Sequence, residues 1–173
     1  MATINKAFWR IDVVLSFAEQ SRRKAQGINK ALKQLGYKTF YYPDYQHTGL
    51  SLEAITEHVY GQKSVTAIVV ISDDYWTSRY CQKEWQLLLQ GLRTRAVKRL
   101  FIIRVGETPI RQVPGDILWL PWTGSGRKIV EQLKPQLLQA LGRPGQPKRL
   151  VLGLMVLVLG LAAMLYWIFP YLA

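Results

Sequence analysis

Apolar runs of strand-like composition alternate along this chain with segments that repeat their apolar residues at helical spacing. The runs 11–17, 65–72 and 99–105 are rich in β-branched and other apolar residues. Such nearly continuous apolar runs are typical of parallel strands that are buried on both faces. Two weaker segments, 37–42 and 116–122, are predicted to add a second and a fifth strand.

Helices are predicted between these strands, over 22–36, 51–60, 79–92 and 126–142. Serines are the expected N-caps of the second and third helices, Ser51 and Ser78. Gly36 is expected to stop the first helix, and Pro135 is expected to interrupt the last one.

Strand–helix alternation indicates an α/β fold in which helices cover both faces of a parallel sheet. With five strands, the flavodoxin-like order 2-1-3-4-5 is expected. Ligands of such sheets bind beyond the carboxyl ends of the strands, where the order reverses between strands one and three. The segments 16–22, 43–50 and 72–84 should therefore meet around any ligand site.

The carboxyl-terminal part of the chain differs sharply from the rest. Residues 150–169, "LVLGLMVLVLGLAAMLYWIF", are an unbroken run of apolar or small residues. A helix of this length spans roughly 30 Å, the thickness of a bilayer's hydrocarbon core. Tyr166, Trp167 and Tyr171 would form an aromatic belt at its far end. A buried helix of a globular core is the alternative, and a run so free of polar groups disfavours it.

The predicted organisation is a soluble domain over 8–141, a basic Gly/Pro-rich linker over 142–149 and a transmembrane helix over 150–170. Positive charges flank the near end of the apolar run, so the positive-inside rule places the soluble domain in the cytoplasm. The amino-terminal residues lack the long apolar core of a signal peptide.

The chain is strongly basic, with 23 Lys and Arg against 11 Asp and Glu and a formal net charge of +12. Such an excess predicts an acidic partner: an anionic lipid surface, a phosphate-bearing ligand or a nucleic acid. No zinc-finger spacing or RNP-like stretch is present, so nucleic acid is not expected. Cys81 is the single cysteine, which excludes an internal disulfide, and no Cys/His set has the spacing of a metal site.

Three stretches then resemble the motifs of Toll/interleukin-1 receptor (TIR) domains: "DVVLSFAEQSRR" (12–23), "GYKTFYYPDYQHTG" (36–49) and "ISDDYWTSRYCQKE" (71–84). The third is the most specific, because five of its residues are in register, namely Ser72, Tyr75, Ser78, Cys81 and Glu84. Two departures stand out. Glu19, Gln20 and Ser21 occupy the loop where the family commonly has an acidic pair, and Tyr80 replaces a tryptophan.

The resemblance implies one of two functions. Some TIR domains cleave the nicotinamide–ribose bond of NAD+, and others only assemble with further TIR domains. In the enzymes the glutamate at the position of Glu84 carries catalysis. One carboxylate could suffice, because the cationic pyridinium departs as neutral nicotinamide and needs no acid. The alternatives are that Glu84 is a surface helix residue paired with a base, and that Cys81 is a small buried apolar residue.

Six further residues are predicted to bind the substrate: Ser16, Phe17, Arg22, Asp44, Tyr45 and Ser78. Each has a plainer alternative. Ser16 and Phe17 could simply pack at a strand end, Arg22 could be solvated, and Ser78 could be only an N-cap. Asp44, Tyr45 and His47 lie in the loop after strand two. In the family this loop moves between neighbouring domains, so the three residues could serve assembly rather than catalysis.

The leading hypothesis is a membrane-anchored NAD+ glycohydrolase that needs no cofactor or metal and takes NAD+ as its substrate. Its expected partners are further copies of itself and the lipid bilayer. The resemblance implies activation by self-association in immunity or cell-suicide signalling. The rival is a non-enzymatic scaffold that recruits partners to the membrane. A flavodoxin-like receiver or flavin protein is disfavoured, because neither an acidic pocket after strand one nor a hydroxyl-rich phosphate loop is present.

Overall fold

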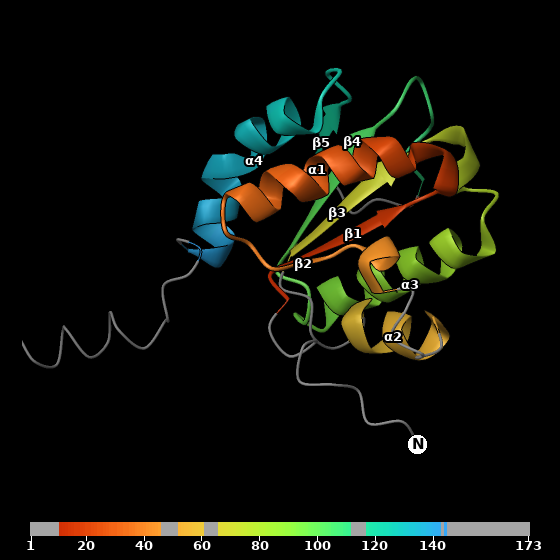
Figure 1. Ribbon diagram of the computed structural model, residues 1–173. Coiled ribbons are helices and arrows are strands. Elements are labelled where there is room, and N and C mark those ends of the chain that lie inside the picture. The colour runs from red at the N-terminus through yellow and green to blue at the C-terminus, as the bar shows by residue number, and fades with distance from the viewer. Residues whose placement is uncertain (1–10, 46–51, 61–65, 112–116, 143, 145–173) are drawn as a thin grey trace, which may run out of the picture.

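A parallel sheet forms the centre of the computed structural model, which describes residues 11–45, 52–60, 66–111, 117–142 and 144 (Figure 1). Its order is β2-β1-β3-β4-β5, and every neighbouring pair is parallel. This confirms the predicted order. The strands are β1 (Val13–Phe17), β2 (Thr39–Phe40), β3 (Thr66–Ile71), β4 (Arg99–Arg104) and β5 (Leu118–Pro121).

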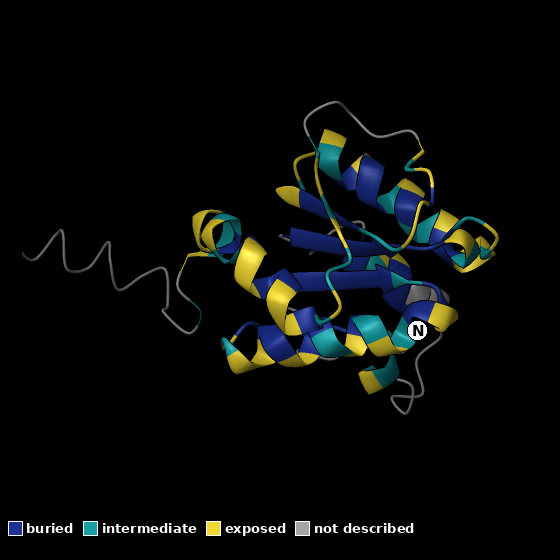
Figure 2. Cartoon of the chain, turned by 90° about the horizontal axis from the view of Figure 1, so that it is seen from above, coloured by how far each residue is buried: buried dark blue, intermediate teal, exposed yellow. Residues whose placement is uncertain are grey.

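Helices cover both faces of the sheet (Figure 1). α1 (Arg22–Gln34) and α4 (Gly126–Leu141) pack on one face, and α2 (Leu52–His58) and α3 (Arg79–Arg93) pack on the other. Short 3-10 turns follow three of the strands: η2 (Glu19–Ser21), η3 (Tyr42–Tyr45) and η5 (Asp73–Tyr75). Figure 2 shows the central strands buried between helices whose outer faces are exposed, whereas the edge strand β5 is largely exposed.

The alternation of side chains along the strands decides which residues reach the site. In β3, Ala67, Val69 and Ile71 join the core under α2 and α3, while Ile68 and Val70 join the core under α1 and α4. Val14 of β1 also faces α3. Because side chains of a strand alternate between faces, Ser16 points to the same side as Val14.

Gly36 ends α1, as predicted. Its φ of 87° lies in the left-handed region that glycine adopts without strain. The amide of Tyr37 donates to the carbonyl of Leu32 at 3.1 Å, and the amide of Gly36 donates to that of Lys33 at 2.9 Å. These two bonds form a Schellman motif. Pro144 lies beside Gly36, so the described chain ends at the amino edge of the sheet.

The prediction that Pro135 interrupts the last helix is wrong, because α4 runs without a break from Gly126 to Leu141. Pro135 is exposed, so the carbonyl of Glu131, which it leaves without an amide donor, can bind water. Buried residues such as Leu133 and Leu137 hold the helix on the sheet.

The predicted membrane-spanning segment, 150–170, lies outside the described residues, as do Ser51 and nearly all of the linker. None of the helices in the described ranges is long and apolar enough to span a bilayer.

Candidate functional site

The candidate site is a cavity of about 170 Å³ at the carboxyl edge of the sheet, between the end of β1 and the start of α3. The structure thus brings together residues of all three segments that were expected to meet there. The lining residues are Leu15, Phe17, Ala18, Glu19, Tyr42, Pro43, Ser78, Tyr80, Cys81 and Glu84.

The second turn of α3 holds Glu84 beside this cavity. Ser78 is the N-cap, and its Oγ accepts a hydrogen bond from the amide of Cys81 at 3.3 Å. This confirms the predicted cap. Residues three positions apart lie on neighbouring parts of a helix surface, so Cys81 and Glu84 follow Ser78 along the side that borders the cavity.

Ser16 binds the Glu84 carboxylate directly. Its Oγ donates to Oε2 of Glu84 at 2.6 Å and lies 2.7 Å from the hydroxyl of Tyr75. A serine hydroxyl has one proton, so donation to Glu84 makes Tyr75 the donor to Ser16. Tyr75, Ser16 and Glu84 therefore form one continuous chain of hydrogen bonds, in which Ser16 and Tyr75 are buried.

Burial raises the pKa of Glu84 to about 7, because desolvation disfavours its charged form. The hydrogen bond from Ser16 opposes this rise, and so does the nearby hydroxyl of Tyr60. In the part of the chain that the structure describes, no basic side chain lies within 4.0 Å of this carboxylate. Glu84 is partly buried. Among the described residues it does not form the ion pair with a basic side chain that was expected if Glu84 were an ordinary surface residue.

Two buried tyrosines support this glutamate, and the sequence interpretation assigned a role to neither. The hydroxyl of Tyr60 donates to the carbonyl of Leu15 at 2.8 Å. Burial raises the pKa values of Tyr60 and Tyr75 well above the usual range, so both stay protonated and act as donors. Tyr75 lies in the third motif, which could have marked it. Tyr60 carries no such signal, because its role depends on packing across the sheet.

Cys81 is 3% exposed, and burial raises the pKa of its thiol to about 11. A thiol is nucleophilic only as the thiolate. At neutral pH this side chain therefore behaves as a small apolar group in the core beneath α3.

Arg22 lies at the margin of the site rather than in it. Its Nη1 donates to Oε1 of Glu19 at 2.8 Å, and both side chains are exposed. Glu19 lines the cavity, whereas Arg22 does not. The loop that departs from the acidic pair thus still places one carboxylate at the cavity that Glu84 lines.

Asp44 and Tyr45 do not line the cavity. Oδ2 of Asp44 accepts from Nζ of Lys33 at 2.7 Å and from Nδ2 of Asn29 at 3.2 Å. These bonds tie the η3 turn to α1. His47, in the same loop, lies outside the described residues.

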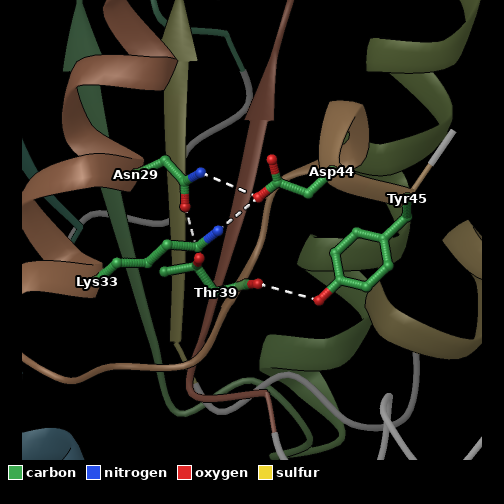
Figure 3. Close-up of polar contacts among 5 residues, drawn as sticks. All are labelled: Asn29, Lys33, Thr39, Asp44 and Tyr45. Atoms are coloured by element: carbon green, nitrogen blue, oxygen red, sulfur yellow. Dashed lines mark hydrogen bonds and ion pairs between the residues drawn. The ribbon is translucent and has the colours of Figure 1, made fainter.

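Tyr45 is held by β2. Its ring stacks on Phe40 with centroids 5.1 Å apart, and its hydroxyl lies 3.4 Å from the carbonyl of Thr39 (Figure 3). These contacts, with those of Asp44, fix the turn that places Tyr42 and Pro43 against the cavity.

Comparison with known proteins identifies the fold. The family model described as TIR domain matches residues 13–139. The chain belongs to the TIR-domain family. Among solved structures, this TIR domain is similar to that of the Toll-related receptor TRR-2 from Hydra magnipapillata, with 22% identity and a TM-score of 0.51. That match covers 75% of this chain and 95% of the other.

A second solved structure contains the TIR domains of the activated Roq1 resistosome, which directly recognizes the pathogen effector XopQ. Identity is 26% and the TM-score is 0.52, over 57% of this chain and 60% of the other. No curated protein matches this TIR domain. Within its described residues, no group of His, Cys, Asp and Glu could hold a metal ion.

Proposed function

We propose that this TIR domain cleaves the nicotinamide–ribose bond of NAD+, with Glu84 as the catalytic carboxylate. The observation that carries the proposal is the Glu84 carboxylate beside the cavity, held by Ser16 at 2.6 Å. The resemblance of the motif around Ser78, Cys81 and Glu84 to that of the NAD+-cleaving members of the family supports it.

The chemistry needs one ionised carboxylate. The bond between C1′ of the ribose and the pyridinium nitrogen breaks, and its electron pair stays on the nitrogen, so nicotinamide leaves neutral. Positive charge develops on the ribose, and an ionised Glu84 stabilises it electrostatically. Water then adds to C1′ and releases a proton, which gives ADP-ribose. Attack by a nitrogen of the adenine ring instead would give a cyclised product.

The other predicted residues would take different parts in this reaction. Ser16 holds the carboxylate, while Phe17 and Ser78 line the cavity. Arg22 would bind a phosphate by leaving Glu19 at the rim. Asp44 and Tyr45 would act through the loop that they anchor rather than by touching the substrate.

Self-association would complete the site. The cavity of about 170 Å³ is smaller than the roughly 300–1,000 Å³ of ordinary ligand pockets, so NAD+ needs further walls. A second TIR domain would supply them. The Roq1 TIR domains belong to an activated resistosome, which agrees with activation by self-association.

A membrane anchor over 150–170 would favour this association, because confinement to a plane raises the effective concentration. The basic linker before it would keep the TIR domain on the cytoplasmic side. The proposed setting is defence or cell-death signalling, in which loss of NAD+ is the output.

The test is an assay of the full chain in liposomes at several surface densities, with NAD+ and nicotinamide followed by chromatography. Glu84→Gln should abolish nicotinamide release, and Glu131→Gln, at an exposed glutamate on α4, should not. Equal release by wild type and Glu84→Gln would refute the proposal.

The scaffold remains the second candidate, and the anchoring of the loop by Asp44 and Tyr45, away from the cavity, favours it. It predicts no nicotinamide release at any density. It also predicts that Glu84→Gln keeps partner recruitment, while substitutions in 43–50 abolish it.

A further inference from the structure

A second cavity, of about 430 Å³, lies on the opposite side of α3 from Glu84. Arg79, Gln82 and Lys83 line it from the helix, and Trp76 and Arg111 line it from the loops after β3 and β4. At 100° per residue, these helical positions point roughly away from Glu84. Its volume falls within the roughly 300–1,000 Å³ typical of small-molecule sites.

The cavity is cationic. Arg79, Lys83 and Arg111 contribute to its lining, and no carboxylate does so among the described residues. Nζ of Lys83 lies 3.1 Å from Oε1 of Glu57 in α2, and the two side chains are 39% and 59% exposed. Neither Arg79 nor Arg111 forms an ion pair within the described ranges. Guanidinium groups without a carboxylate partner favour an anion, and phosphate matches their forked geometry.

The cavity also has a rigid aromatic wall. The indole of Trp76 is fixed by a hydrogen bond from its Nε1 to the carbonyl of Pro109 at 2.9 Å. It packs edge to face on Trp85, with centroids 5.5 Å apart. The guanidinium of Arg111 lies 5.9 Å from the Trp76 ring centroid. A fixed indole beside two arginines can stack a flat ring while the arginines bind its charged substituent.

Trp85 adds a further observation. It is 1% exposed and lines this cavity, and its Nε1 has no hydrogen-bond partner among the described residues. Because that atom is itself buried, Trp85 contributes its ring to the cavity wall rather than a hydrogen-bond donor.

We propose that this cavity binds a free ligand that joins a flat aromatic ring to a phosphate, as a nucleoside monophosphate does. The fixed indole favours such a ligand over a lipid headgroup, because a headgroup phosphate carries no flat aromatic ring that could stack on Trp76. The site is separate from the cavity at Glu84 and does not depend on the proposed reaction.

The experiment titrates AMP onto the full chain in detergent, followed by tryptophan fluorescence and by calorimetry. We expect saturable binding with a Kd on the order of 1 mM or tighter. Arg79→Gln and Arg111→Gln should each weaken it by on the order of tenfold, as loss of a charge-assisted hydrogen bond predicts. Arg93→Gln, at an exposed arginine in the last turn of α3, is the matched control and should leave binding unchanged. Adenosine and inorganic phosphate should each bind at least tenfold more weakly than AMP.

Four results would overturn the proposal. The first is the absence of saturable AMP binding, and the second is an equal loss in Arg93→Gln, which would indicate only diffuse charge. The third is a loss in Tyr80→Ala with retention in Arg111→Gln, which would place AMP in the cavity at Glu84. The fourth is binding of the chain to anionic vesicles that requires Arg79 and Arg111 but is not reduced by added AMP. Glu84→Gln should bind AMP as the wild type does, so failure of the proposed reaction leaves this test intact.

Discussion

Removal of the Ser16 hydroxyl should shift the pH dependence of NAD+ cleavage to higher pH. Ser16 donates to the Glu84 carboxylate at 2.6 Å and lowers the pKa of that group. A hydrogen bond to a charged group contributes about 1.5–3 kcal/mol. At 1.36 kcal/mol per unit, Ser16→Ala should raise the pKa by about one to two units.

The effect on rate follows from the ionised fraction. With a pKa of about 7, roughly half of Glu84 is ionised at pH 7 in the wild type. A rise of one to two units reduces this fraction to about 1–10%, so cleavage at pH 7 should fall roughly 5- to 50-fold. At high pH, where Glu84 is ionised in both proteins, the two rates should converge.

The assay is nicotinamide release by the full chain in liposomes across a pH series. Ser72→Ala is the matched control, because Ser72 is also buried but its Oγ has no hydrogen-bond partner within the described residues. Its pH profile should match that of the wild type. A rate for Ser16→Ala that is reduced equally at every pH, with the same inflection, would refute the reasoning.

Three further outcomes are expected. Burial raises the pKa of Glu84 from 4.5 to about 7, so the folded chain binds this proton more tightly than the unfolded chain, and stability is lost as pH rises from about 4.5 through 7. Glu84→Gln should therefore raise the free energy of unfolding by about 3 kcal/mol near pH 8 and by little near pH 4.5. Urea unfolding measures this free energy, and an equal increase at both pH values would contradict the prediction. Ser78→Ala and Ser125→Ala each remove an N-cap, so each should lower the free energy of unfolding by about 1 kcal/mol. Only Ser78 lines the cavity, so only Ser78→Ala should also slow NAD+ cleavage. The pKa of about 11 at Cys81 predicts alkylation of the folded chain near pH 8 that is roughly a hundredfold slower than that of an exposed thiol, and rapid alkylation measured by mass spectrometry would show an accessible thiolate.

The sequence alone determined the layout of the fold. β3 is buried on both faces, so its continuous apolar run directly predicts a central parallel strand. The stop at Gly36 and the cap at Ser78 were predictable because both depend on a few neighbouring residues. The predicted interruption at Pro135 was wrong because it depends on tertiary packing and not on neighbouring residues alone. The packing of α4 on the sheet outweighs one lost backbone hydrogen bond.

Only the tertiary structure decided how the side chains pair. Ser16 and Glu84 meet because the register of β1 against β3 and the packing of α3 bring them together, and neither is visible in periodicity. The same packing buries Tyr60 and Tyr75 beside the carboxylate and raises its pKa. Periodicity reports which residues are buried. It does not report which buried polar groups share a hydrogen bond, because that depends on distances between elements far apart in the chain.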